Sequence, residues 1–141
     1  MENIEIKIIP SDKIEIILPL LEELNPKIEK NILKIRLLDM TSQNYKCVGV
    51  YHFDKLVGIS GLWFLTRLYC GKILEPDHVI ITSQYRSKGL GKILFNWIYN
   101  YAQSIGYEAS ELNTYISNVK SHEFYENEGY KKLGYHYIKY F

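Results

Sequence analysis

Two glycines, Gly89 and Gly91, stand among three cationic side chains in the stretch RSKGLGKIL, where a long amphipathic segment begins. The first amide N–H groups of a helix have no partner inside it, and the helix dipole makes that end partly positive. A glycine lets an anion approach such amides without meeting a Cβ, and it tolerates a positive φ. Residues 86–91 therefore indicate a strand-to-helix turn that cradles a phosphate, with charge added by Arg86, Lys88 and Lys92.

Two common phosphate motifs do not match this stretch. It lacks the four-residue gap and the Lys-Ser/Thr ending of a P-loop, and Leu94 stands where a dinucleotide fingerprint has its third glycine. A glycine turn bordered by solvated lysines, with no ligand, fits the same nine residues. The turn alone therefore leaves the anion site open.

A second candidate for chemistry lies in NVKSHEFYENEGY, residues 118–130. On a helix, Phe124 would face the core while Tyr125, about 100° further round, presents its hydroxyl at the edge of a pocket. A tyrosine in a short helix is more often structural than catalytic. By itself, this stretch therefore does not indicate a catalytic tyrosine.

The first half of the chain predicts a strand and two helices. IEIKII, residues 4–9, alternates with period two and stops at Pro10, as a half-buried strand does. A helix follows to Leu24, capped by Ser11 or Asp12, and Pro19 is expected to bend it. Asn25-Pro26 predicts the start of a second helix, with one apolar face made by Ile28, Ile32, Ile35 and Leu38.

The middle of the chain predicts three strands. Residues 45–53 and 56–65 indicate a hairpin, in which Gly58 and Gly61 predict a bulge or a close backbone approach. Residues 73–82 predict a further strand, with an irregular start at Pro76.

The last third begins with the strongest helical pattern. Its apolar stripe runs from Leu90 to Ile105 and stops at Gly106. A strand over 108–116, a short helix ending at Gly129 and a final strand over 131–141 follow. The order βααβββαβαβ predicts a single α/β domain spanning residues 1–141.

Composition excludes several classes of function. The chain has 141 residues, and its 17 basic and 16 acidic side chains leave a formal charge of +1. With so small a net charge, the protein has no overall electrostatic field that would attract nucleic acid or an anionic membrane, so neither is an expected partner. The N-terminus lacks the layout of a secretory signal, no apolar run could span a bilayer, and Cys47 and Cys70 fit no metal spacing. A cytoplasmic protein without a metal site is expected.

Taken together, the two motifs resemble those of the GNAT superfamily of acetyl-CoA-dependent N-acetyltransferases. Arg86, Gly89 and Gly91 match the pattern Arg/Gln-x-x-Gly-x-Gly/Ala. The second pattern, Asn-x-x-Ala-x-x-Phe-Tyr-x-x-x-Gly-Phe, is matched at Asn118, Phe124, Tyr125 and Gly129, with Ser121 for alanine and Tyr130 for phenylalanine. The order of elements agrees as well, so the resemblance covers essentially the whole chain.

The resemblance implies a mixed, mostly antiparallel sheet flanked by helices, and acetyl-CoA as cosubstrate. In the family, the strand before the glycine turn splays from its neighbour, and its backbone amides meet the acetyl carbonyl and the pantetheine arm. Asn118 either contacts that arm or caps its helix. The implied cofactor contacts are Val79, Ile80, Ile81, Arg86, Ser87, Lys88, Gly89, Leu90, Gly91, Lys92, Asn118 and Ser121.

The resemblance also implies the catalytic groups. In the family the leaving-group acid is a tyrosine at the position of Tyr125, and a phenol stays protonated at neutral pH, ready to donate. A purely structural or thiol-positioning role is the alternative. Many relatives carry a carboxylate that acts as the general base on the strand before the turn. In this chain the candidates are Glu75 and Asp77, and a chain of water molecules in place of a side-chain base is the alternative. Alternation places these two on one face of the strand, with His78 opposite.

The implied reaction is transfer of acetyl to a primary amine of a small molecule by direct attack. The C-terminal stretch is similar to small-molecule acetyltransferases, including the aminoalkylphosphonate N-acetyltransferases. A protein or peptide acetyltransferase is the second possibility, but Glu22, Glu23, Glu29 and Asp39 are too scattered to form an acidic groove. A non-catalytic acyl-CoA-binding module is the third. A homodimer fits the resemblance, although no residue marks an interface.

Overall fold

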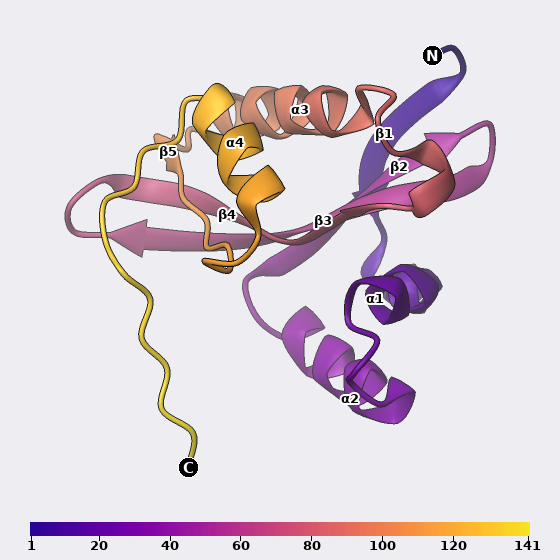
Figure 1. Cartoon of the computed structure of the whole chain (residues 1–141), viewed down its shortest axis with the longest axis horizontal. Coiled ribbons are helices and arrows are strands. Elements are labelled where there is room, and N and C mark those ends of the chain that lie inside the picture. The colour runs from indigo at the N-terminus through magenta and orange to yellow at the C-terminus, as the bar shows by residue number, and fades with distance from the viewer.

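Five strands form one curled, mixed sheet in the computed structural model, which describes all of residues 1–141 (Figure 1). The strands lie side by side in chain order, the first four antiparallel and the last parallel to its neighbour. Their bounds are Ile4–Ile9 for β1, Tyr45–His52 for β2, Lys55–Arg67 for β3, Gly71–Ile81 for β4 and Ala109–Ser110 for β5. The predicted fold class is confirmed, since helices flank both faces of this sheet.

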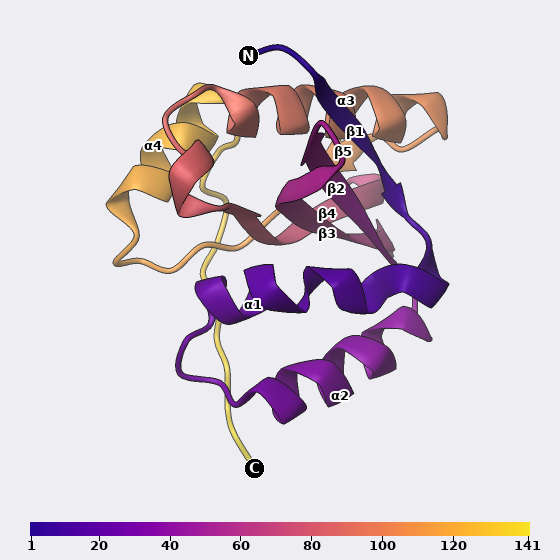
Figure 2. The same ribbon diagram turned by 90° about the vertical axis from the view of Figure 1, so that its right-hand side faces the viewer.

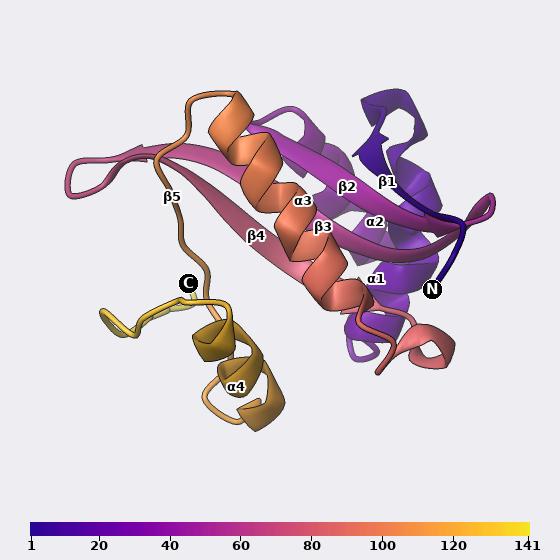
Figure 3. The same ribbon diagram turned by 90° about the horizontal axis from the view of Figure 1, so that it is seen from above.

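The helices form a layer on each side of the sheet (Figure 2). One layer holds α1 (Leu18–Leu24), which continues a 3-10 turn over Ser11–Ile17, and α2 (Lys30–Thr41). The other holds α3 (Leu90–Ser104), and α4 (Val119–Asn127) lies beside the N-terminal half of α3 (Figures 2 and 3). None of these helices has both the length and the apolar character needed to cross a membrane.

Alternating strand residues supply the two halves of the core. Cys47 and Ile59 pack with α1 and α2, whereas Val48 and Leu62 pack with α3. All four side chains are fully buried. Since each fully buried aliphatic side chain contributes about 1.5–3 kcal/mol, these two apolar layers hold the sheet between its helices.

The N-terminal predictions are partly confirmed. β1 has the predicted bounds, and Pro19 lies in the first turn of α1, where the 3-10 turn changes into α-helix. The predicted start of the second helix is wrong. The backbone and side-chain N–H groups of Asn25 both donate to the Leu21 carbonyl, at 2.8 and 3.1 Å, so Asn25 ends α1 and α2 begins only at Lys30.

The predicted apolar face of α2 is also wrong. Leu33 and Leu37 are the buried residues, whereas Ile32, Ile35 and Leu38 are exposed. Apolar residues occur all around this helix, so their spacing does not select one face. Contact with α1 and the sheet makes that choice.

The central strands and α3 follow the predictions closely. β2 and β3 form the predicted hairpin, with a register shift beside Gly58, and the pairing of β3 with β4 shifts register beside Gly61. α3 ends at Ser104, and Gly106 follows with φ +82°, as its predicted role as a helix stop requires.

The last two predicted strands differ from the structure. The strand expected over 108–116 is reduced to β5, which has two residues. The final strand expected over 131–141 is wrong, because these residues pair with no strand and all of them are exposed. They run away from the sheet as an extended tail (Figure 1). Strand composition does not produce a strand unless a neighbour satisfies its backbone groups.

Candidate functional site

An open edge on β4 is the first component of the candidate site. β5 pairs with β4 at only two positions, Ile73↔Ala109 and Leu74↔Ser110. From Glu75 to Ile81, no strand lies on the outer side of β4 (Figure 3). Unpaired N–H and C=O groups along a strand can bind an extended ligand by strand-like hydrogen bonds. The predicted residues Val79, Ile80 and Ile81 form the last part of this edge.

The open edge leads into the N-terminus of α3, which presents free amides. Gly89 is the N-cap residue with φ +79°, and a Cβ added there would meet no atom within 4 Å. The first backbone bond of the helix runs from the Ile93 N–H to the Gly89 carbonyl, at 3.3 Å. The amides of residues 90–92 precede it and have no acceptor in the helix. Gly89 thus supplies both the left-handed turn and open space above these amides.

Gly91 has a different role from Gly89. It lies within α3 without a positive φ, and a Cβ there would sit 3.6 Å from the Phe124 ring of α4. That is an ordinary van der Waals distance, so alanine also fits. Gly91 marks the point where α4 packs against the start of α3, which brings the two sequence motifs together.

The three cations around the turn differ in what they contact. Arg86 pairs with Glu23 at 2.9 Å and also donates to the Ile81 carbonyl. Lys92 lies 3.4 Å from Glu128, whose side chain is only 7% exposed. Lys88 alone has no carboxylate partner, so the backbone amides are the main anion-binding groups of the turn.

Sequence reasoning missed the part played by Glu23. Besides Arg86, its carboxylate accepts from the Thr82 hydroxyl at 2.7 Å and from the Ser83 N–H at 3.1 Å. This one side chain of α1 therefore holds the loop between β4 and α3. About 60 residues separate the partners in sequence, so no local pattern could have revealed the contact.

Asn118 and Ser121 lie at the N-terminus of α4. The Asn118 side-chain oxygen accepts from the Ser121 N–H at 3.2 Å, which makes Asn118 the N-cap. The structure therefore confirms helix capping, one of the two roles that the sequence predicts for Asn118. An N-cap of this type stabilises a helix by about 1 kcal/mol, and it sets the direction in which α4 leaves the preceding loop.

Tyr125 lies on the inner side of α4 with an unpaired hydroxyl. Its ring packs against Phe95, Phe124 and Tyr130, at centroid distances of 5.7, 5.5 and 5.8 Å. Burial, assisted by the neighbouring Tyr130, raises the pKa of Tyr125 to about 12. The phenol is therefore protonated at neutral pH, and no acceptor in the chain takes its proton.

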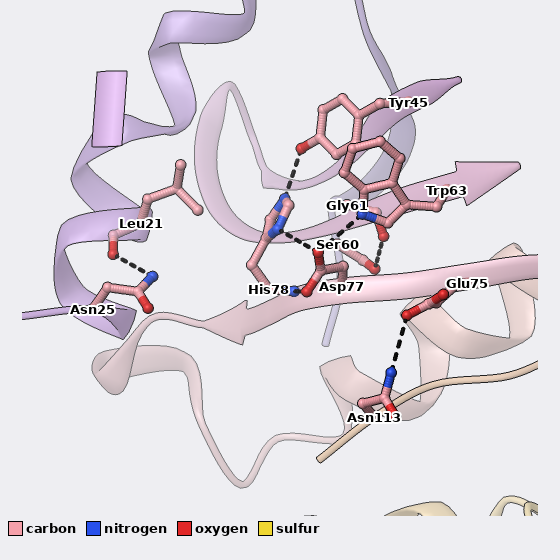
Figure 4. A network of polar contacts seen from close by, with 10 residues as sticks. All are labelled: Leu21, Asn25, Tyr45, Ser60, Gly61, Trp63, Glu75, Asp77, His78 and Asn113. Atoms are coloured by element: carbon pink, nitrogen blue, oxygen red, sulfur yellow. Dashed lines mark hydrogen bonds and ion pairs between the residues drawn. The ribbon is translucent and has the colours of Figure 1, made fainter. Parts of the chain in front are cut away.

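A bulge in β4 shapes the other side of the strand. The register with β3 shifts between Ile59 and Gly61, and His78 has φ +36°. The predicted position of His78, opposite Asp77, is wrong, because the bulge turns both side chains toward the layer of α1 and α2 (Figure 4). Gly61 makes room for the imidazole, since a Cβ there would lie 2.3 Å from the ring.

A polar network surrounds this bulge. The Tyr45 hydroxyl lies 2.6 Å from His78 Nε2, and the other ring nitrogen faces Asp77 at 3.6 Å (Figure 4). The Trp63 indole N–H donates to the same Asp77 carboxylate at 2.9 Å. Hydrogen bonding to His78, its charge and the Trp63 bond together lower the pKa of Asp77 to about 2. Asp77 is therefore a weak proton acceptor held in place by its partners.

Glu75 has the opposite electrostatic environment. Burial raises its pKa, and the negative charges of Asp77 and Glu111 act in the same direction. Its one side-chain partner is Asn113, whose amide donates to it at 3.4 Å from the loop before α4. Of the two predicted carboxylates, Glu75 is the one that its environment makes the better general base.

The sequence assigns this arrangement to a family. A family model described as the acetyltransferase (GNAT) family matches residues 15–130, which is most of the chain and includes both motifs. The chain belongs to the GNAT family of acetyltransferases. GNAT enzymes are N-acetyltransferases that use acetyl-CoA, so the open edge and the glycine turn belong to an acetyltransferase domain.

Solved structures with the GNAT fold resemble the chain along nearly its whole length. A possible acetyltransferase from Clostridium difficile 630 has 21% identity and a TM-score of 0.84, over 99% of this chain and 97% of the other. An aminoglycoside acetyltransferase from an uncultured soil metagenomic sample has 13% identity and a TM-score of 0.81, with the same coverage. The ribosomal-protein-alanine N-acetyltransferase of Brucella melitensis has 19% identity and a TM-score of 0.82, over 98% and 99%.

These similarities show the fold and do not select among acceptors. Among curated proteins, none matches this chain by sequence. The narrower resemblance to aminoalkylphosphonate acetyltransferases finds no counterpart in these comparisons and stays a prediction.

The residues present fit the acetyl-CoA that GNAT enzymes use. The open edge of β4 offers backbone groups to an amide-containing arm, and it ends where α3 offers free amides to a pyrophosphate. No side chain fills the space above Gly89. We expect the pantetheine arm of acetyl-CoA to lie along β4 and its pyrophosphate to lie at Gly89.

Proposed function

We propose that this protein transfers the acetyl group of acetyl-CoA to a primary amine of a small molecule. The observation that carries the proposal is the continuity of the open β4 edge with the amide cradle of α3. Tyr125 and Glu75, which can donate and accept a proton, belong to the elements that border this path.

The acidic residues of the N-terminal helices favour a small acceptor over a basic protein tail. Glu22 lies 3.7 Å from Lys30, Glu23 holds Arg86, and the Asp39 backbone and side chain accept from Gln43. These groups are used inside the chain and do not form a free acidic groove. Acetylation of a protein amine, the activity named for the Brucella neighbour, is therefore the second candidate.

In the proposed mechanism each proton has a named carrier. Glu75 takes a proton from the ammonium form of the acceptor, directly or through water, which frees the nitrogen lone pair. The C–N bond forms as the nitrogen attacks the acetyl carbonyl, and amides of the β4 edge stabilise the negative oxygen. As the C–S bond breaks, the Tyr125 hydroxyl donates its proton to the leaving thiolate, and the nitrogen releases its second proton through water to the phenolate. Glu75 returns the first proton to solvent, so that an ammonium ion and acetyl-CoA give the amide, the CoA thiol and one free proton.

The proposal is tested by thiol release from acetyl-CoA in the presence of a panel of amines. The panel contains aminophosphonates, amino sugars, polyamines and peptides with a free N-terminus. We expect turnover with at least one small amine and little with peptides. Turnover with peptides alone would replace the proposal with the protein-directed alternative. CoA binding without turnover on any member would support the non-catalytic module.

A second prediction separates the two carboxylates of β4. Glu75→Gln is expected to lower kcat/KM on the order of 10-fold at neutral pH, since water can take over part of the base's role. Because its pKa is raised, Glu75 becomes a carboxylate only as the pH rises through that higher value. The wild-type rate should therefore climb over this range by a step that Glu75→Gln lacks.

The matched control is Asp77→Asn, measured over the same pH range. The pKa of Asp77 is lowered to about 2, so Asp77 is fully ionised near neutrality and contributes no such step. Ionisation of the amine affects all three proteins equally, so the difference between profiles isolates the side chain. If Asp77→Asn removed the step and Glu75→Gln kept it, the assignment of the base would be reversed.

A further inference from the structure

Three side chains form a row across β2, β3 and β4, on the face of the sheet that carries α1 and α2. The strand register pairs Tyr45 with Trp63, and Trp63 in turn with Glu75 (Figure 4). Residues paired directly across neighbouring strands project from the same face, with their Cβ atoms about 5 Å apart. The indole of Trp63 is therefore the direct neighbour of Glu75, the proposed general base.

The indole of Trp63 is held in place and is still accessible. Its N–H donates to the Asp77 carboxylate at 2.9 Å, and its ring centroid lies 5.0 Å from that of Tyr45. The Tyr45 hydroxyl is fixed in turn by His78. Trp63 packs on the core beneath α1 and α2 but is only partly buried. A ring that is already fixed loses little conformational entropy when a ligand packs on its accessible surface.

The charges around Glu75 favour a cationic ligand. Burial raises the pKa of Glu75 most, and the negative charges of Asp77 and Glu111 add to this effect. Arg67 opposes them, but it already pairs with Glu111 at 2.8 Å. An ammonium group is attracted to this part of β4, whereas a carboxylate or phosphonate close to the amine would be repelled.

The face of an indole ring attracts cations as well. Its quadrupole binds an ammonium group that lies within about 6 Å of the ring centroid, and tryptophan does so better than tyrosine or phenylalanine. A nitrogen that gives its proton to Glu75 can lie within this range of Trp63, because the two residues are directly paired across the strands. The ring and the base can therefore act on the same nitrogen.

We propose that Trp63 determines the class of acceptor. Its indole binds the ammonium group and the adjoining methylene groups of an aliphatic primary amine that has no acidic group near the nitrogen. The inference rests on the proposed acetyl transfer, in which Glu75 takes a proton from that nitrogen. Within that function it favours alkylamines and diamines over the aminophosphonates that the C-terminal resemblance suggests. Asp77 acts through Trp63, because it fixes the indole.

The test measures the binding of propylammonium by isothermal titration calorimetry, with CoA present in place of acetyl-CoA so that no turnover occurs. Trp63→Leu keeps an apolar side chain and removes the ring, and its Kd for propylammonium should rise on the order of 10-fold. Trp63→Phe loses the same bond to Asp77 but keeps a ring face. Its Kd should stay within about 3-fold of the wild-type value, so the two variants separate the ring from the hydrogen bond.

A second pair of ligands tests the selection by charge. The ligand 3-aminopropionate has a carboxylate in place of the terminal methyl group of propylammonium. We expect the wild type to bind it on the order of 10-fold more weakly, since the carboxylate meets the negative charges around Glu75.

Phe64→Leu is the matched control. Phe64 follows Trp63 in β3 but packs on the opposite face of the sheet, with α3. Its substitution should leave the Kd for propylammonium unchanged. The Kd for CoA should be equal in the wild type and all three variants, which shows that the variants fold.

Three results would overturn the inference: equal Kd values for Trp63→Leu and Trp63→Phe, binding of 3-aminopropionate as tight as that of propylammonium, or no binding of propylammonium. Thiol release from acetyl-CoA judges the acetyl transfer separately. Turnover of other amines at rates that Trp63→Leu leaves unchanged would refute the role of Trp63 alone. Binding of propylammonium that depends on the Trp63 ring, without turnover of any amine, would refute the acetyl transfer alone.

Discussion

Replacing Tyr125 with phenylalanine is expected to lower kcat about 100-fold at neutral pH, since a positioned acid contributes at least this much to such reactions. The change removes one oxygen and leaves the ring among Phe95, Phe124 and Tyr130. The hydroxyl makes no hydrogen bond in the chain, so stability should hardly change. Steady-state kinetics with saturating acetyl-CoA measures the effect, and the KM for acetyl-CoA should stay close to the wild-type value.

The pH dependence sharpens this prediction. Because the pKa of Tyr125 is raised to about 12, the proton stays on the phenol throughout the usual assay range. The wild type should therefore show no loss of rate from this group on the alkaline side below about pH 11. An alkaline decline near pH 9 that Tyr125→Phe removed would mean that the hydroxyl ionises far more easily than its surroundings indicate.

Tyr130→Phe is the matched control for Tyr125→Phe. It removes the same atom from a neighbouring ring of the same aromatic cluster, where the hydroxyl bonds to Ser110. We expect a small loss of stability and a kcat within a few-fold of wild type. Equal kcat values for Tyr125→Phe and the wild type would show that Tyr125 has only a structural role.

Replacing Gly89 with valine is expected to weaken CoA binding about 10- to 100-fold, through lost hydrogen bonds from the amides to a charged phosphate. Two causes act together. Valine resists the φ of +79° at this position, and its side chain would fill the open space above the amides. Isothermal titration calorimetry with CoA measures the affinity, and urea unfolding measures the accompanying loss of stability.

Gly106→Val separates the loss of the cradle from backbone strain. Gly106 has φ +82°, and a Cβ there also meets no atom within 4 Å, but it lies after the opposite end of α3. Both variants should lose about 1–3 kcal/mol of stability from the strained backbone. Only Gly89→Val should lose affinity. Similar affinities for the two variants would refute the phosphate cradle.

Local sequence patterns predicted the structure correctly where the local backbone conformation or periodicity favours particular residue types. Gly89 and Gly106 adopt the left-handed conformations that glycine tolerates. Leu90, Leu94 and Ile98 of the predicted α3 stripe are buried, whereas its members Ile93 and Ile105 are 40% exposed. The hairpin of β2 and β3 also formed as predicted. In each case the residues that determine the structure are neighbours in sequence.

Predictions failed where a specific contact in the folded chain, rather than residue type or alternation, decided the structure. Asn25 favoured a helix start by type, yet its two bonds to Leu21 end the preceding helix. His78 was expected opposite Asp77 by alternation, but a bulge that depends on the space left by Gly61 turned it over. The tail has the composition of a strand and no partner strand within the single chain.

The sequence by itself determined the fold class, the family and the two motifs that match those of the family, because each follows from residue types at short and regular spacing. Only the tertiary structure decided which groups are free to act. It paired Arg86 with Glu23 and Lys92 with Glu128, and it made Glu75 and Asp77 electrostatically different. Charge pairing and burial depend on distances in space between residues far apart along the chain, and no local pattern encodes those distances.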